Sequence, residues 1–207
     1  MNPKTFFNLS DIWFSNLFKL VNTWKVLFEL NSYIKKTTLK KPKEFKKYKK
    51  NVLIGKKTVI KQNVVFEGNC IIGKNCIIGP NTYLRENVLI GDNVRIGNCV
   101  EIKNSIILNN SFISHLSYIG DSIIGSEVSI GAGTILSNLR LDKKEIILRF
   151  KRKRVNTKLK KFGSIIGDNT KIGSNVVLNP GTILEKNCRV LPLKNVKGYF
   201  PKKTIIK

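Results

Sequence analysis

Aliphatic residues recur every six positions through most of this chain, and many are followed directly by glycine. The repeat begins at Ile54, slips once, and resumes at Ile166 after a gap. Its core positions are Ile54, Ile60, Phe66, Ile72, Ile78, Leu84, Ile90, Ile96, Ile102, Leu108, Ile119, Ile124, Ile130, Ile166, Ile172, Leu178, Leu184, Val190 and Val196. An amphipathic helix would repeat every 3.6 residues, so a six-residue period kept over this length is typical of a solenoid.

The six-residue unit predicts a short strand followed by a corner. One aliphatic side chain of each unit fills a shared interior, and the Gly or Asn that follows permits the backbone angles of a tight turn. Three units complete a triangular coil, so residues eighteen apart are expected to lie above one another at the spacing of sheet strands, about 4.8 Å. The sequence therefore predicts an all-β fold, a parallel β-helix.

The only histidine of the chain, His115, lies where the repeat slips, because Leu108 and Ile119 are eleven residues apart instead of twelve. Such a slip bends the backbone, and bends of this kind often accompany functional side chains. A single histidine is also commonly structural. Arg85 and Lys103 are eighteen apart, which predicts two stacked cations that could hold a phosphate.

Residues 1–50 fall outside the repeat. Ser10 and Asp11 are expected to cap a helix whose apolar positions are Ile12, Trp13, Leu17, Phe18, Leu20, Val21, Trp24, Leu27, Phe28 and Leu30. We favour a helix that packs over the open end of the solenoid, and the alternative is a helix on a membrane surface. The lysine-rich run 35–50 is interpreted as a solvated linker. The expected domains are 1–50 and 51–207.

The net charge and the positions of the cysteines limit the kinds of partner and of metal site that the chain is expected to have. The chain has 38 Lys and Arg against 13 Asp and Glu, a formal net charge of +25. This excess suggests an anionic partner, but it is spread along the whole chain and no RNA-recognition motif is present, so nucleic acid is not favoured. The four cysteines occupy repeat positions and are expected to be free thiols that bind no metal: Cys70, Cys76, Cys99 and Cys188. No signal peptide or spanning segment is visible, which favours the cytoplasm.

Three segments resemble a known family: LRENVLIGDNVRIGNCVEIKNS, HLSYIGDSIIG and VSIGAGTILSN. They are similar to the left-handed β-helix acetyltransferase domain of the bifunctional N-acetylglucosamine-1-phosphate uridylyltransferase and glucosamine-1-phosphate N-acetyltransferase family. The later segments SNLRLDKK and KFGSIIGDNTKIGSNVVLNPGT resemble related sugar-1-phosphate nucleotidylyltransferases. The resemblance covers roughly residues 51–192. It implies a left-handed β-helix, acetyl-CoA as co-substrate, an amino-sugar phosphate as acceptor, and a homotrimer with sites between subunits.

The resemblance also assigns roles to individual residues. His115 matches the general base of the family. The other matches are Arg85 and Lys103 for the sugar phosphate, Tyr118 and Ser129 for the sugar, and Ala132, Asn138, Lys144 and Ser174 for acetyl-CoA, with Lys144 contributed by a neighbouring subunit. Ser129 replaces an asparagine of the family, and Leu139 replaces a tyrosine. These two departures bear on which sugar is used.

The chemistry explains why these residue types are needed. An uncharged amine attacks the thioester and then loses a proton, and imidazole with a pKa near 6.5 suits that transfer at neutral pH. The competing hypothesis is a non-catalytic β-helix scaffold or regulatory partner of a separate sugar nucleotidyltransferase. About 50 residues before the repeat cannot build a nucleotidyltransferase domain, so pyrophosphorylase activity is not expected.

Residues 139–162 interrupt the repeat. The alternation in EIILRF and the basic segment that follows predict a protruding two-stranded arm. Its eight Lys and Arg between Arg149 and Lys161 form either a solvated surface or a clamp for the anionic coenzyme and a neighbouring subunit. Two more coils follow to about Val196, and the basic end of the chain is expected to lie as a tail on the last coil.

Overall fold

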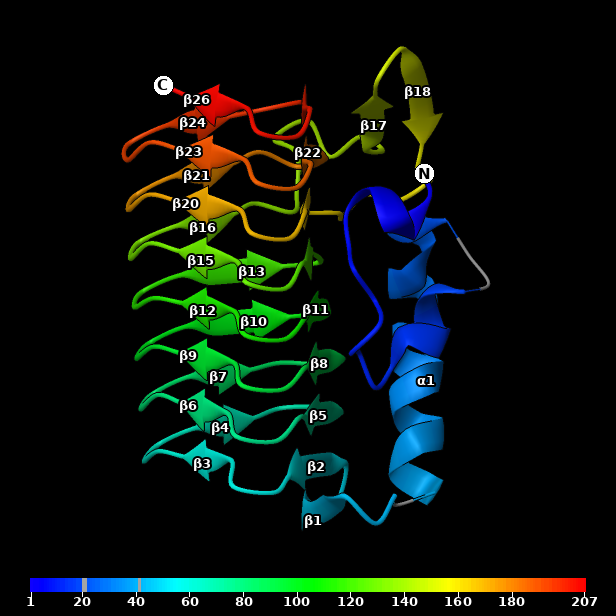
Figure 1. The fold of residues 1–207 in the computed structure, drawn as a ribbon, viewed down its shortest axis with the longest axis vertical. Helices are drawn as coiled ribbons and strands as arrows, with labels where there is room; N and C mark the ends of the chain where they lie inside the picture. The colour runs from blue at the N-terminus through cyan, green and yellow to red at the C-terminus, as the bar shows by residue number, and fades with distance from the viewer. Residues whose placement is uncertain (20–21, 41) are drawn as a thin grey trace.

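The computed structural model describes residues 1–19, 22–40 and 42–207. Short strands wind around a common axis and stack into three parallel sheets (Figure 1). As the chain climbs from β2 towards β26, it runs leftward along the near face and rightward along the far face, so the coil is left-handed. The predicted left-handed parallel β-helix is confirmed.

Each coil contributes one strand to each sheet. Sheet A contains β1 (Phe45–Lys49), β2 (Val52–Gly55), β5 (Cys70–Ile72), β8 (Val88–Ile90), β11 (Ser105–Ile107), β14 (Ile123–Ile124), β19 (Ser164–Ile166), β22 (Thr182–Leu184) and β25 (Tyr199–Phe200). Sheet B contains β3 (Val59–Ile60), β6 (Ile77–Ile78), β9 (Arg95–Ile96), β12 (Phe112–Ile113), β15 (Ser129–Ile130), β20 (Lys171–Ile172), β23 (Arg189–Val190) and β26 (Ile205–Ile206). Sheet C contains β4 (Val65–Phe66), β7 (Tyr83–Leu84), β10 (Glu101–Lys103), β13 (Tyr118–Gly120), β16 (Ile135–Leu136), β21 (Val177–Leu178) and β24 (Asn195–Val196).

The register confirms the eighteen-residue coil at the start of the solenoid, where Ile54 pairs with Ile72 and Ile72 with Ile90. Ile90 then pairs with Ile107, seventeen residues on, and Ile107 with Ile124. The coil shortens because the corner between sheets C and A loses one residue in both places.

The predicted core position Leu108 is therefore wrong. Ile107 fills the interior, and Leu108 is buried outside it, in the second apolar cluster of the molecule. The slip lies between Ile102 and Ile107 and recurs between Ile119 and Ile124, whereas Ile113 and Ile119 keep their six-residue spacing. His115 thus stands in phase with the repeat.

A second apolar cluster lies on the outer face of sheet A. The middle residues of its strands, such as Leu53, Ile71 and Leu89, point away from the solenoid interior and are fully buried. The N-terminal segment covers them, with Leu30 and Ile34 of the helix α1 (Val26–Lys40) in the same cluster. The segment packs along the side of the solenoid, as Figure 1 shows, and not over its open end as expected.

The N-terminal helix also begins later than expected. Residues after Ser10 form short 3-10 turns, η2 (Ser15–Phe18) and η3 (Thr23–Lys25), after an earlier turn η1 (Pro3–Thr5), and only α1 is an α-helix. The side chain of Asn8 accepts hydrogen bonds from the Ser10 backbone N–H and hydroxyl, which holds a local turn there. The expected apolar positions Leu20 and Val21 lie outside the described residues.

The run 35–50 is not a solvated linker throughout. It comprises the end of α1 and then β1, which pairs antiparallel with β2. Among the helices of the described ranges, none has the length and apolar character needed to cross a bilayer.

The predicted two-stranded arm is confirmed. β17 (Ile147–Phe150) pairs antiparallel with β18 (Lys153–Asn156), and Leu148 is buried in the second cluster, so the base of the arm packs on sheet A. The expected tail is instead a further coil, because β25 pairs with β22 and β26 with β23. The four cysteines are free, as expected, and Cys99 alone among them is exposed.

The outer face of sheet A should contribute as much to stability as the solenoid interior. Ile71→Ala is expected to lower the free energy of unfolding by about 2–5 kcal/mol, because it opens a cavity under the N-terminal segment. Urea unfolding followed by circular dichroism measures this change. Ile205→Ala is the matched control, since Ile205 is 53% exposed and its truncation should cost under about 1 kcal/mol. Equal effects of the two substitutions would contradict the packing described.

Candidate active site

The predicted functional residues gather at the two corners that border sheet C. The chain turns from sheet B into sheet C at the His115 corner, and from sheet C into sheet A at the Asp121 corner. Because the strands of sheet C are short, both corners belong to one face of the solenoid.

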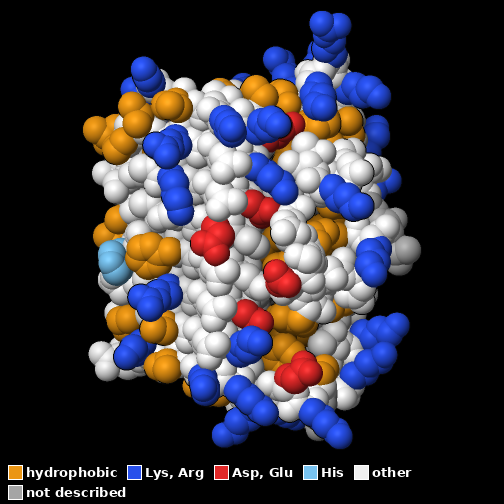
Figure 2. All heavy atoms as spheres, in the orientation of Figure 1, with side chains coloured by type: hydrophobic (Ala, Val, Ile, Leu, Met, Phe, Trp, Pro, Cys, Tyr) orange, Lys and Arg blue, Asp and Glu red, His pale blue; other side chains and the backbone are white. Residues whose placement is uncertain are grey.

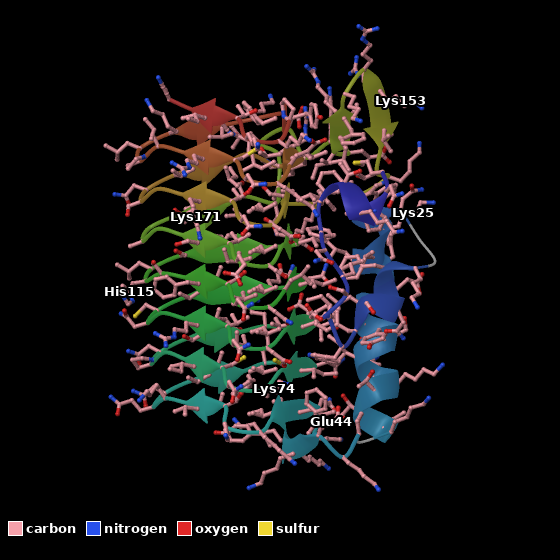
Figure 3. All side chains as sticks on the ribbon, viewed as in Figure 1. Lys25, Glu44, Lys74, His115, Lys153 and Lys171 are labelled. Atoms are coloured by element: carbon pink, nitrogen blue, oxygen red, sulfur yellow. The ribbon has the colours of Figure 1, made fainter. Side chains whose placement is uncertain are left out.

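At the His115 corner, three predicted residues lie in successive coils. The Gly133 backbone N–H donates to the His115 carbonyl oxygen at 2.9 Å, and the Asn175 N–H donates to the Ala132 carbonyl at 2.8 Å. Ser174 directly precedes Asn175, so His115, Ala132 and Ser174 form a column. Figure 3 shows His115 at the outer edge of the solenoid, on the side away from α1.

The imidazole of His115 is exposed, and the backbone N–H of Asn98 donates to its Nδ1 at 3.2 Å. With Nδ1 as acceptor, the neutral ring carries its proton on Nε2. Gly97 makes this position possible, because a Cβ there would lie 2.7 Å from Nδ1. The ring is held by one hydrogen bond and is open to a ligand.

The backbone beside His115 is left-handed at Leu116, which has φ 57 and is 64% exposed. The same position is left-handed in other coils of the column, at Asn63, Asn81, Cys99 and Leu193. The conformation therefore belongs to this corner of the solenoid and is not specific to His115.

The Asp121 corner holds a connected set of polar side chains. Asp121 is 6% exposed and accepts hydrogen bonds from Asn104 Nδ2, at 2.8 Å, and from Asn138 Nδ2. Asn138 Nδ2 also donates to the Tyr118 hydroxyl at 3.1 Å. Gly120 leaves the space for this contact, because a Cβ there would lie 2.7 Å from both the hydroxyl and the amide nitrogen. Tyr118 and Asn138 are therefore fixed relative to each other.

Burial raises the pKa of the Tyr118 phenol above its ordinary value, and the charges of Asp121 and Glu101 raise it further. The phenol thus keeps its proton at neutral pH. Since Asn138 donates to its oxygen, the Tyr118 O–H is available as a donor.

Leu84 and Ile102 are paired in register in adjacent coils. Arg85 directly follows Leu84 and Lys103 directly follows Ile102, so the two cations are stacked as predicted. The structure adds carboxylates that the sequence analysis did not predict. Arg85 Nη1 lies 3.1 Å from Glu101 Oε1, and this hydrogen bond raises the pKa of the guanidinium. Glu86 lies 3.4 Å from Lys103 Nζ.

Two more carboxylates lie near the guanidinium. Arg85 Nε is 3.3 Å from Glu67 Oε2 and 3.8 Å from Glu86 Oε2, and it is buried without a geometrically good hydrogen bond in the described part of the chain. These ion pairs compensate the buried N–H, and a ligand would reach Arg85 through the other nitrogens of its guanidinium.

Two predicted residues lie apart from these groupings, and a third lies in the other grouping from the one expected. Ser129 is on the outer face of sheet B, between Phe112 and Lys171 in register. Lys144 is exposed at the start of the arm. Asn138, expected with Ala132 and Ser174, lies instead at the opposite corner.

Sequence reasoning missed Asp121, the residue that joins Asn104 to Asn138. It stands within the quoted segment HLSYIGD, and the five-residue step from Ile119 to Ile124 marks its corner. Among the described residues, no cluster of His, Cys, Asp or Glu could hold a metal ion.

Comparison with protein families gives a match over residues 66–206 to the family model described as the GMPPB C-terminal domain. Most of the solenoid lies within this match.

Two curated relatives agree with the predicted resemblance. The chain is 39% identical over 74 residues to a bifunctional sugar-1-phosphate nucleotidylyltransferase/acetyltransferase from Sulfurisphaera tokodaii, covering 36% of this chain and 18% of that protein. It is 44% identical over 78 residues to the bifunctional protein GlmU of Methanococcus vannielii, covering 35% and 19%. The chain thus matches less than a fifth of the length of these relatives. The predicted resemblance to the bifunctional family is confirmed over that region.

Among solved structures, a UDP-N-acetylglucosamine acyltransferase from Campylobacter jejuni aligns with a TM-score of 0.37 and 13% identity, covering 74% of this chain and 68% of that one.

The raised pKa of Tyr118 predicts a pH dependence. The stability that the neutral phenol contributes is complete below the ordinary pKa of 10.0 and is lost as the pH rises through the higher value of the folded state. The contribution of Tyr118 to the phenolate absorbance is the difference between the wild type and Tyr118→Phe. This difference should therefore appear only above pH 10.0.

Asp121→Asn should move this titration to lower pH, because it removes a negative charge beside the phenol. Glu127→Gln removes a carboxylate from another corner and is the control. A Tyr118 transition at or below pH 10.0, or one indifferent to Asp121→Asn, would contradict the described environment.

Proposed function

The chain belongs to the family described as the GMPPB C-terminal domain, and from this premise we propose that it is an acetyl-CoA-dependent N-acetyltransferase acting on an amino-sugar phosphate. One observation carries the proposal. Residues spread from Arg85 to Ser174 in the sequence converge on the two corners of a single face. The name of the Sulfurisphaera tokodaii relative, a sugar-1-phosphate nucleotidylyltransferase/acetyltransferase, supports both the acetyl transfer and the sugar-1-phosphate.

The two corners suit the two ends of one acceptor. His115 and Tyr118 are three residues apart along the same turn of chain, a span of about 10 Å at roughly 3.3 Å per strand residue. The phosphate is proposed to lie near Arg85 and Lys103, because the register stacks these two cations in adjacent coils. The amine would then point towards His115.

His115 is the proposed general base. The attacking amine must lose a proton as the new amide bond forms, and a base is useful only if it has a free lone pair. In the present ring position Nε2 carries the proton and Nδ1 accepts from Asn98. We therefore propose that substrate binding breaks the Asn98 contact, so that Nδ1, which holds the free lone pair of the neutral ring, accepts the amine proton while Nε2 keeps its own.

The corner formed by Ala132 and Ser174 is the proposed place of the coenzyme. It is built from small residues, and Gly133 has φ 71. A Cβ on Gly131 would lie 2.5 Å from the Ser174 backbone nitrogen, so the coils here are closely stacked and leave little side-chain bulk in front. Acetyl-CoA would supply the activated acyl group.

Ser129 and Lys144 fit this proposal only across a subunit boundary. Ser129 lies around the edge on sheet B, and Lys144 extends from the arm. We propose a homotrimer in which neighbouring chains bring such residues to the sheet C face, and we place the reaction in the cytoplasm.

A second candidate is the non-catalytic scaffold or regulatory partner of a separate sugar nucleotidyltransferase. The carboxylates of Glu67, Glu86 and Glu101 favour it, since they already surround Arg85 at 3.1–3.8 Å and weaken its attraction for a phosphate. A scaffold would keep the β-helix without turnover.

The enzymatic proposal predicts a large loss on removing the base. With glucosamine-1-phosphate or galactosamine-1-phosphate as acceptor, His115→Ala should lower kcat by about 10²–10⁴-fold without changing the unfolding midpoint. Release of free coenzyme A thiol measures turnover. Ile205→Ala, at an exposed position in the last coil, is the control. No turnover by the folded wild type with any hexosamine phosphate or nucleotide-linked amino sugar would favour the scaffold.

Removing the cation at the other corner should act on binding. Lys103→Gln is expected to raise KM for the sugar phosphate about tenfold or more, because a charge-assisted contact with the phosphate is lost, while kcat changes less. Lys25→Gln removes an exposed lysine from the N-terminal segment, on the side of the molecule away from the proposed site, and should leave KM unchanged. An unchanged KM in Lys103→Gln would place the phosphate elsewhere.

A further inference from the structure

A pocket of about 460 Å³ opens at the first coil of the solenoid, between β1 and the loop that follows β2. It lies far from His115 along the axis, since Figure 3 places Glu44, one of its lining residues, at the end of the molecule where the solenoid begins. None of the residues assigned to acyl transfer lines it.

The inner wall of the pocket is apolar. Ile54 and Ile60 belong to the first coil of the interior, and the coil leaves Ile60 only partly covered. Tyr48 also lines the pocket, is 50% exposed, and packs on Phe66 of the interior with ring centroids 5.5 Å apart. A wall of this composition favours an apolar group of a ligand.

The rim of the pocket is cationic. Lys43, Lys46, Lys56 and Lys57 line it, and Glu44 is the one acidic lining residue. None of the four lysines forms an ion pair within the described ranges. Figure 2 shows Lys and Arg side chains gathered at this end of the molecule.

Four ammonium groups around one opening repel one another, and an anion placed between them relieves that repulsion. The contrast with the Asp121 corner is informative, because there the cations have carboxylate partners. At the pocket the chain supplies too little negative charge, so the missing partner is expected to come from a ligand.

We propose that this pocket binds a phosphate monoester attached to an apolar body. A bare phosphate would leave the wall formed by Tyr48, Ile54 and Ile60 unfilled, and an uncharged apolar molecule would leave the lysines without a partner. The volume is within the usual range for small-molecule sites, roughly 300–1,000 Å³. The phosphate monoester is either a free metabolite or the headgroup of a membrane lipid, and both have the same chemistry.

Binding of octyl phosphate, measured by isothermal titration calorimetry on the full chain, tests the site. Inorganic phosphate carries the charge alone and octyl glucoside the chain alone, and both should bind at least about tenfold more weakly. Lys46→Gln/Lys56→Gln should weaken octyl phosphate binding about tenfold or more. Lys35→Gln/Lys36→Gln is the matched control, since it removes the same charge from exposed positions on α1 outside the pocket.

The unfolding midpoint of each variant verifies that the fold is kept. Absence of octyl phosphate binding to the wild type, or equal weakening in the two double variants, would overturn the proposal, because attraction by net charge would then explain any binding.

Co-sedimentation with vesicles of phosphatidylcholine and phosphatidic acid separates the two sources of the ligand. Sedimentation lost in Lys46→Gln/Lys56→Gln and kept in the control would identify a lipid headgroup. Failure to sediment, together with octyl phosphate binding, would identify a free phosphate ester.

Discussion

The corners of the solenoid depend on residues that adopt left-handed backbone angles. Within the solenoid, each such residue helps to turn the chain from one sheet into the next, and asparagine is the commonest non-glycine residue among them, as at Asn75, Asn93 and Asn110. The conformation costs about 1–2 kcal/mol for most L-residues and less for asparagine, whose side chain hydrogen-bonds locally. Every strand register, and every alignment of functional side chains, follows from where these corners fall.

The side chains at these corners form hydrogen-bonded ladders that both stabilise the solenoid and position candidate substrate contacts. On the corner between sheets A and B, Asn75 donates to Asn93 at 3.1 Å, and Asn93 to Asn110 at 3.0 Å, which forms a ladder along the axis. On the corner between sheets C and A, Asp121 occupies the middle of an equivalent ladder and positions Asn138 beside Tyr118. An asparagine ladder in which Asp121 replaces one asparagine thus fixes the positions of two candidate substrate contacts, Tyr118 and Asn138.

The repeat made the solenoid and its stacking predictable, because a core position every six residues leaves few alternatives. The alternation of EIILRF likewise predicted the arm. The N-terminal cover was harder to predict, since α1 is positioned by the outward residues Leu53 and Ile71, and their role appears only once sheet A is known to have two apolar faces. The sequence did contain one signal of these two apolar faces, which is the run of three consecutive apolar residues in β2 and in β8.

The sequence predicted most of the residues of the candidate site, but it did not predict how they lie relative to one another. The stacking of Arg85 on Lys103 followed from spacing alone. The position of the shortened corner did not, because Ile107 and Leu108 are both aliphatic and the choice between them depends on backbone angles at Asn104, whose φ is 43. The carboxylates around Arg85 come from three coils, and their convergence required the register.

The central claim is that sheet C and its two corners form one acceptor site, and the single histidine permits a direct test by nuclear magnetic resonance. The imidazole of His115 gives the only histidine signals in the spectrum, and their nitrogen shifts report which ring nitrogen carries the proton. Addition of glucosamine-1-phosphate with coenzyme A should shift these signals saturably, most of all at Nδ1, because ligand binding breaks the hydrogen bond from Asn98. A signal unchanged at concentrations where calorimetry detects the sugar phosphate bound would contradict the account.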